Sequence, residues 1–264
     1  MGLSENIRQS VFQYIVETLR YKFENYVVGD EVMPFHFRLL GKDRMALYSF
    51  IQSINTMFGT SIFEQTAVKL AKNRFKEARG HVRAYNKISV EAQTTIQSII
   101  DNLSSSITAP NKPNEIELLR TVSKDSNVHG ISTPLVDLWL ESFDGQLYLI
   151  DIKTVKPNIG SFISFKRTLL EWAAVELAED NHRVTHSLIA MPYNPFEPEP
   201  YRSWQLRGML DLDHELLVGK SFWDFVGGEG AYEDLLDCFE QAGVTLRPEI
   251  DRYFSRFNVH KNEF

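Results

Sequence analysis

Residues 134–156 read PLVDLWLESFDGQLYLIDIKTVK, and this stretch decides the fold of the chain. Two apolar runs, 135–143 and 146–154, flank the dipeptide Asp144–Gly145. An Asp-Gly pair between two apolar runs is a strong signal for a two-residue β-hairpin turn. We therefore expect two antiparallel strands joined by a tight turn, with a register that the turn fixes.

Three charged side chains lie in this hairpin. Strand side chains alternate between faces, so Asp151 and Lys153 are expected to point the same way. Asp137 lies on the partner strand, where paired residues are side by side across the hairpin. Two carboxylates and an ammonium would then meet at the edge of a sheet, an arrangement that suits a divalent cation and a water molecule beside a phosphate.

Mg²⁺ is the expected cation, because it takes oxygen ligands from carboxylates, water and phosphate. Asp137 and Asp151 would supply carboxylates, and the carbonyl of Ile152 a third protein oxygen. Lys153 would orient the attacking water or stabilise charge on the scissile phosphate, since its ammonium is a compact point charge. The sequence thus predicts hydrolysis of a phosphodiester.

The same pattern also occurs in edge hairpins whose Asp and Lys side chains face the solvent. Two observations favour a site over that alternative. Both acids are flanked by apolar residues, among which an unpaired carboxylate is costly. Basic residues follow the hairpin, and such side chains suit a phosphate backbone. By proximity, the candidate DNA contacts are Lys156, Asn158, Lys166 and Arg167.

A further acid, Glu64, shares an apolar helical stripe with Val68, Ala71 and Phe75. A carboxylate in such a stripe needs a partner. Glu64 would either complete the metal site from the N-terminal helices or pair with a buried Lys or Arg, and the residues alone leave both possibilities open.

Composition limits the class of protein. The chain has 264 residues, of which 43% are hydrophobic, and its one cysteine excludes a disulfide framework. A reducing cytoplasm is the expected compartment. No apolar run is long enough to span a bilayer, so we expect no membrane partner. The net charge of −7 argues against nucleic acid, but residues 69–87 carry seven basic side chains against one acid, which indicates a local positive face.

Apolar spacing predicts the remaining elements. In the first half we expect helices over 7–19, 47–58, about 61–79 and about 89–103, then a loop over 104–114 and a short helix capped by Asn114. After the hairpin we expect a long helix from Phe162, a strand over 184–191 and a proline-rich loop over 192–200. A helix over about 232–242, ended by Gly243, and a last helix after Pro248 complete the chain.

These residues resemble a known family. Asp137, Asp151 and Lys153 resemble the PD-(D/E)xK nuclease motif, with Pro134 three residues before the acid instead of next to it. Five blocks, spread in order along most of the chain, are similar to the TdeIII family of type II restriction endonucleases: FHFRLL at 35–40, FGTSIFE at 58–64, DIKTVKPN at 151–158, LLEW at 169–172 and FWDF at 222–225.

The resemblance implies a homodimeric, Mg²⁺-dependent enzyme of the prokaryotic cytoplasm. It would cut double-stranded DNA at a short palindrome of the GGNCC kind and leave 5′-phosphates. Asp137 and Asp151 would be metal ligands and Lys153 the catalytic lysine, and Glu64 lies in a matching block. Two alternatives remain: a structure-specific repair or junction nuclease with the same core, and a non-catalytic DNA-binding protein.

The implied fold class is α/β, with a restriction-endonuclease-like core. A small mixed β-sheet flanked by helices would follow a helical N-terminal part. We expect one nuclease domain over 1–264, in which 1–120 are mainly helical and 121–264 hold the catalytic core and the C-terminal helices.

Overall fold

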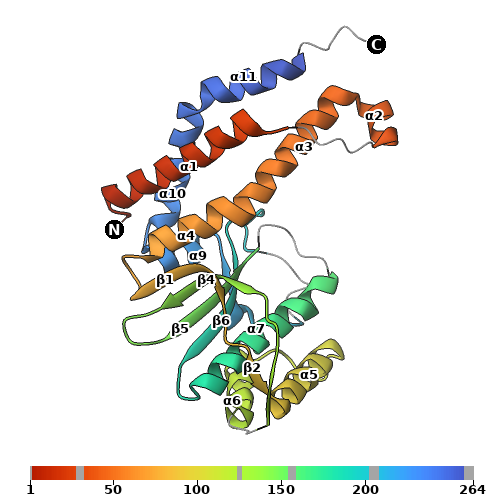
Figure 1. The fold of residues 1–264 in the computed structure, drawn as a ribbon, viewed down its shortest axis with the longest axis vertical. Coiled ribbons are helices and arrows are strands. Elements are labelled where there is room, and N and C mark those ends of the chain that lie inside the picture. Colours follow the sequence, from red (N-terminus) through yellow and green to blue (C-terminus); the bar gives the residue numbers. More distant parts are fainter. Residues whose placement is uncertain (1, 28–32, 124–126, 154–158, 202–207, 259–264) are drawn as a thin grey trace. The chain divides into compact units, whose positions relative to one another are not determined.

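The computed structural model describes residues 2–27, 33–123, 127–153, 159–201 and 208–258. They form two compact units, one of Met1–Thr66 with Glu229–Phe264 and one of Ala67–Gly228. The second unit holds a five-stranded mixed sheet flanked by helices, and the N-terminal region is helical (Figure 1). The predicted fold class is therefore confirmed. In the part of the chain that the structure describes, no helix has the length and apolar character needed to cross a membrane.

The five-stranded sheet is half antiparallel and half parallel. Its order is β1 (Glu77–Arg83), β4 (Leu135–Glu141), β5 (Leu147–Ile152), β6 (Thr185–Met191) and β7 (Leu216–Val218). The pairs β1–β4 and β4–β5 are antiparallel, whereas β5–β6 and β6–β7 are parallel. A separate two-stranded sheet pairs β2 (Lys87–Ser89) with β3 (Val128–Gly130).

The predicted hairpin is β4 and β5. Leu138 pairs with Ile150 and Glu141 with Leu147, and the backbone N–H of Ser142 donates to the carbonyl of Gln146. A three-residue loop, 143–145, therefore joins the strands, and the predicted two-residue turn is wrong. A two-residue turn would pair Asp137 with Ile152, whereas the observed register sets Asp137 opposite Asp151. Gly145 has a φ of 83°, a conformation that a residue with a side chain adopts only at a cost. After β5 the chain crosses to the parallel strand β6 through helix α7 (Ile159–Glu179), as parallel pairing requires.

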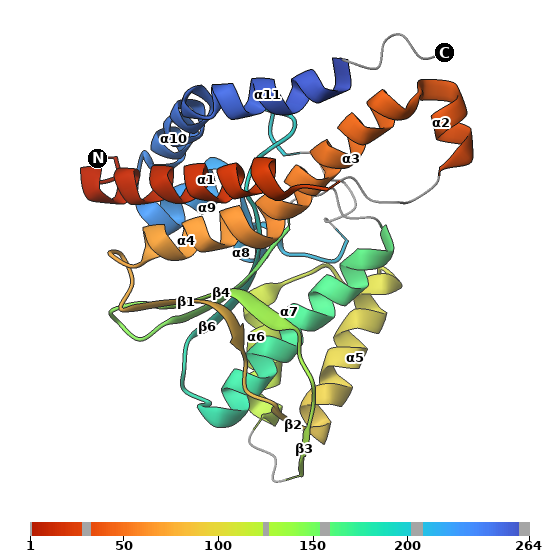
Figure 2. The same ribbon diagram turned by 45° about the horizontal axis from the view of Figure 1, so that its top comes forward.

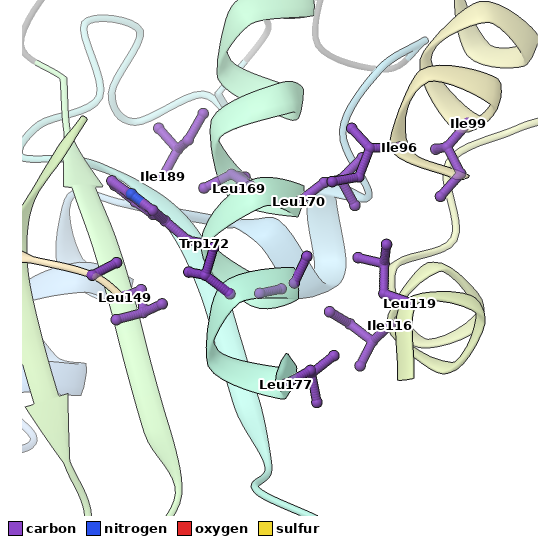
Figure 3. Packing of buried hydrophobic residues seen from close by; sticks show 14 of the residues in the cluster. Ile96, Ile99, Ile116, Leu119, Leu149, Leu169, Leu170, Trp172, Leu177 and Ile189 are labelled. Carbon is purple, nitrogen blue, oxygen red and sulfur yellow. The ribbon is translucent and has the colours of Figure 1, made fainter. Parts of the chain in front are cut away.

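Three helices of the second unit, α5 (Val90–Ser104), α6 (Lys112–Val122) and α7, pack against one another (Figure 2). Their apolar faces form a core with strands β5 and β6, and Figure 3 labels its members Ile96, Ile99, Ile116, Leu119, Leu149, Leu169, Leu170, Trp172, Leu177 and Ile189. Trp172 is fully buried, and its indole N–H donates to the carbonyl of Pro134 at 3.1 Å. This bond ties α7 to the chain just before β4. Short helices α8 (Leu212–Glu215) and α9 (Lys220–Gly227) also belong to this unit.

The other unit is helical. It contains α1 (Glu5–Asn25), α2 (Pro34–Leu40), α3 (Lys42–Met57), the π-helix η1 (Phe58–Phe63), the start of α4 (Glu64–Ala71), α10 (Ala231–Thr245) and α11 (Arg247–Asn258). Phe23, Phe50 and Tyr253 form its buried aromatic cluster, in which the rings of Phe50 and Tyr253 stack at 4.0 Å. Segments from both ends of the chain therefore build one packed unit.

Besides the length of the hairpin turn, three sequence predictions about elements are wrong. The helix expected to continue to Arg79 ends at Ala71, and β1 follows, because 77–83 pair with β4. The N-cap of α6 is Asn111, whose side chain accepts from the backbone N–H of Asn114. Gly243 does not end α10, which continues to Thr245. The predicted helix over about 89–103 and the strand over 184–191 are confirmed as α5 and β6.

Candidate active site

Asp137 and Asp151 lie on neighbouring strands of the sheet. The last printed pair of the β4–β5 ladder is Leu138 with Ile150, so the next position on each strand is an acid. Asp151 is buried, with 8% of its surface exposed, and Asp137 is half-buried. The carboxylate oxygen Oδ2 of Asp137 accepts from the backbone N–H of Ile152 at 2.8 Å. This bond orients the Asp137 carboxylate at the end of β5.

Lys153 lies beside Asp151, as strand alternation predicts. Its Nζ atom is 2.6 Å from Oδ1 of Asp151. The backbone N–H of Lys153 donates to the carbonyl of Ala190 at 2.8 Å, which continues the pairing with β6. The ammonium is also 5.5 Å from the centre of the Phe165 ring on α7, within the range of a cation–π contact. Contacts within the same unit therefore fix both the backbone and the side chain of Lys153.

Burial and the two neighbouring charged groups determine the pKa of Asp151. Burial raises the pKa of Asp151 to about 6, even though the Lys153 ammonium pulls it down, and the neighbouring Asp137 carboxylate raises it further. One ammonium therefore does not compensate both the burial and the repulsion between the two carboxylates. A further positive charge at this point would stabilise the ionised pair.

This raised pKa predicts how the stability of the metal-free protein depends on pH. Between about pH 4 and pH 6 the folded chain keeps a proton on Asp151 that the unfolded chain has lost, so stability falls as pH rises through this window. Asp151→Asn removes this titration. We expect the melting temperature of the variant, minus that of the wild type, to increase across the window in EDTA. A difference that stays constant with pH would contradict the assignment.

Lys166 lies in a buried ionic network and not on the surface. It has no exposed surface, and its Nζ atom forms ion pairs with Glu115 of α6 and with Glu215 of α8, the latter at 2.7 Å. Lys112 of α6 reaches the other oxygen of Glu215 at 2.9 Å. Burial raises the pKa of Glu215, but the two ammonium groups outweigh it and hold the pKa below its ordinary value. The predicted DNA contact at Lys166 is not available in this structure, because the side chain is enclosed and paired.

The structure describes two of the other predicted site residues, Arg167 and Glu64. Arg167 is half-exposed on α7, and its Nη2 donates to Oε1 of Gln97 at 2.6 Å. Lys156 and Asn158 lie outside the described residues. Glu64 is buried at the start of α4 and belongs to the unit that contains the chain's two ends. Its part in the site stays a prediction.

The structure adds residues on β1 that the sequence reading assigned to a helix. The exposed positions of this strand carry Glu77, Arg79, His81 and Arg83. The Arg79 guanidinium lies over the Trp139 ring of β4, with its carbon 4.0 Å from the ring centre. A ring nitrogen of His81 lies within 4.8 Å of a carboxylate oxygen of Asp137. Alternation of charged and small or apolar residues over 77–83 was the one signal that could have identified this strand.

A comparison with protein families shows what kind of protein carries this site. The family described as "Type II restriction endonuclease, HinfI" matches residues 3–243. The chain belongs to the HinfI family of type II restriction endonucleases. Members of this class are site-specific deoxyribonucleases, so the expected enzyme class is confirmed and DNA is the partner of this HinfI-family enzyme.

Individual restriction enzymes are similar to this HinfI-family chain over most of its length. The type II restriction enzyme HgiCII of Herpetosiphon aurantiacus is 27% identical over 230 residues, which cover 84% of this chain and 81% of HgiCII. HgiEI of the same organism is 26% identical over 227 residues, or 83% of this chain and 80% of HgiEI. MjaII of Methanocaldococcus jannaschii is 27% identical over 291 aligned residues, or 98% of this chain and 75% of MjaII.

The residues at the end of the β4–β5 hairpin fit a divalent cation, which restriction endonucleases generally need. Asp137 and Asp151 present carboxylates at neighbouring positions, and Lys153 alone does not offset the burial of Asp151, whose pKa stays raised. Carboxylate oxygens are the ligands that hard divalent cations take. The bond from the Ile152 N–H to Asp137 is the kind of secondary contact that orients a metal-binding carboxylate.

Proposed function

We propose that this HinfI-family enzyme hydrolyses double-stranded DNA with Mg²⁺ at a short palindrome of the GGNCC kind and leaves 5′-phosphates. The observation that carries the proposal is the arrangement of Asp137, Asp151 and Lys153 at the end of one hairpin. The five sequence blocks that resemble the TdeIII family support the proposed target.

In the proposed reaction Asp137 and Asp151 hold the cation, and the carbonyl of Ile152 supplies a third oxygen. Glu64 is a further candidate ligand from the helical unit. Bound Mg²⁺ supplies positive charge at the phosphate and lowers the pKa of a water molecule. All these protein ligands are oxygens, as Mg²⁺ prefers.

Lys153 is proposed to act on the water and the phosphate. Its ammonium is held by the ion pair with Asp151 and by the contact with the Phe165 ring, so it loses little freedom when substrate binds. From this position it orients the attacking water in line with the leaving 3′ oxygen and stabilises the charge that develops on the phosphoryl oxygens. The 5′-phosphate remains on one product end.

DNA contacts are proposed for Lys156, Asn158 and Arg167, all of which follow the hairpin in sequence. Arg167 is the one of the three that the structure describes, and its guanidinium is half-exposed. Basic side chains of this kind bind the phosphate backbone and fix the position of the enzyme on the duplex. A palindromic target has two equivalent strands, so a homodimer with one site for each strand is the proposed assembly.

Digestion of phage DNA tests the proposal. The purified protein is incubated with the DNA in Mg²⁺ or in EDTA, and the ends of the products are sequenced. We expect discrete fragments in Mg²⁺ only, with ends that map to one GGNCC-like sequence and carry 5′-phosphates. Cleavage at branched or damaged positions would instead identify a repair or junction nuclease. Binding without cleavage in any divalent metal would overturn the proposed reaction.

A further inference from the structure

Strand β1 places an imidazole beside one of the two carboxylates. β1 is at the edge of the sheet and pairs with β4 (Figure 1). Gly80 pairs with Leu138 and Val82 with Val136, so His81 falls opposite Asp137. The proximity of the two side chains agrees with this register, since a ring nitrogen of His81 and a carboxylate oxygen of Asp137 lie within 4.8 Å. Both residues belong to the same compact unit.

The backbone of His81 is itself unusual. Its φ is 53°, in the left-handed region that residues with side chains rarely enter. Such a conformation is uncommon inside a strand, and residues held in it cluster at functional sites. The side chain is exposed, so burial in the core does not account for the presence of an imidazole here. Proximity to Asp137 and an uncommon backbone are separate observations about one residue.

We propose that His81 is a nitrogen ligand of the divalent cation that Asp137 holds. The inference rests on the proposed function, because it uses the same metal site. Two ligand atoms bound to one ion at about 2.1 Å each are at most about 4.2 Å apart. A separation within 4.8 Å is therefore close to what is needed, and a small side-chain rotation brings both atoms to one ion. Neutral imidazole binds metals through either ring nitrogen.

A nitrogen ligand changes which cations the site prefers. Sites that include imidazole bind Ni²⁺ and Co²⁺ more tightly than sites made of oxygen alone, whereas Mg²⁺ gains little from nitrogen. Removal of the ring should therefore weaken Ni²⁺ and Co²⁺ binding more than Mg²⁺ binding. An imidazole that only supports the fold would leave the order of cation affinities unchanged.

Two variants separate the ring from the backbone conformation. His81→Gly accepts a positive φ without strain and has no side chain. His81→Asn tolerates the left-handed region and replaces the ring with a short amide. His182→Asn is the matched control, since His182 is exposed and precedes β6, whose residue Thr185 pairs with Leu147 at the end of β5 away from Asp151. Circular dichroism establishes that each variant is folded.

The direct readout is pulsed electron paramagnetic resonance of Mn²⁺ bound to the full chain without DNA. We expect modulation from a directly bound nitrogen in the wild type and in His182→Asn, a change of that modulation on ¹⁵N-histidine labelling, and its loss in both His81 variants. Titration calorimetry should show Ni²⁺ affinity reduced roughly 10-fold or more in the His81 variants. Absence of nitrogen modulation in the wild type, or its persistence in His81→Gly, would overturn the inference.

The outcomes distinguish this inference from the proposed function. Mg²⁺-dependent DNA cleavage by a protein whose bound Mn²⁺ shows no nitrogen coupling would remove His81 from the metal site and leave the reaction intact. Nitrogen coupling in a protein that does not cut DNA in any metal would leave His81 as a ligand and overturn the reaction.

Discussion

Asp151→Asn should reduce DNA cleavage by about 10³-fold or more while leaving the fold intact. The substitution keeps the shape of the side chain and removes the buried carboxylate that is proposed to hold the cation. Loss of one preorganised charged group at a reacting phosphate is commonly worth about 10²–10³-fold in rate, and loss of a metal ligand also weakens cation binding. Single-turnover cleavage of a short duplex that contains the target, at saturating enzyme and Mg²⁺, measures the effect.

Asp144→Asn is the matched control for this variant. Asp144 lies in the turn of the same hairpin, is exposed and bonds with Ser142 and Gln146 at the opposite end of the strands. Its substitution should leave the cleavage rate within about 2-fold, because surface changes away from special features have small effects. Full activity in Asp151→Asn would remove Asp151 from the proposed site, whereas equal losses in both variants would point to damage to the hairpin.

Lys166→Met should lower the free energy of unfolding by about 3–5 kcal/mol. The side chain has no exposed surface, so its removal leaves Glu115 and one oxygen of Glu215 buried without their ammonium. Breaking a buried ion pair from one side is strongly destabilising for this reason. Urea unfolding followed by circular dichroism, without metal or DNA, measures the change.

Arg167→Met tests the neighbouring residue on the same helix, where the side chain is half-exposed and bonds to Gln97. Its cost in stability should be within about 0.5 kcal/mol. The effects on DNA affinity should be reversed. Arg167→Met should bind DNA more weakly than the wild type, and Lys166→Met should bind it about as well at temperatures where this variant is folded. If Lys166→Met were as stable as the wild type but bound DNA more weakly, Lys166 would be a DNA contact, as the sequence predicted.

The hairpin and the direction of its charged side chains were predictable because their signals are local. The Asp144–Gly145 pair predicted where the chain turns, and the alternation of apolar residues placed Asp151 and Lys153 on one face. The loop has one residue more than predicted, so the exact register was not predicted. The fold class followed from the same change of pattern, from helical spacing to strands.

Contacts between residues far apart in the sequence could not be predicted in this way. β1 carries Arg79, Gly80 and Arg83, and nothing in its own residues shows that it will pair with β4. From the sequence we predicted Lys166 to be a DNA contact at the surface, because its partners Glu115 and Glu215 are far away in sequence. His81 had no assigned role for the same reason, since its neighbour Asp137 becomes apparent only when β1 and β4 pair.

The division of the chain into units has a consequence for its synthesis. Residues 67–228 form one unit without a break, whereas residues 1–66 share theirs with 229–264. The ribosome synthesises α1 before α10. The apolar face of α1, which includes Val11 and Ile15, therefore stays uncovered until α10 has been synthesised. Domains fold as units during synthesis, so the segment with Asp137 and Asp151 can complete its fold earlier. The helical unit can therefore complete its packing only after the unit that carries the two acids has been synthesised.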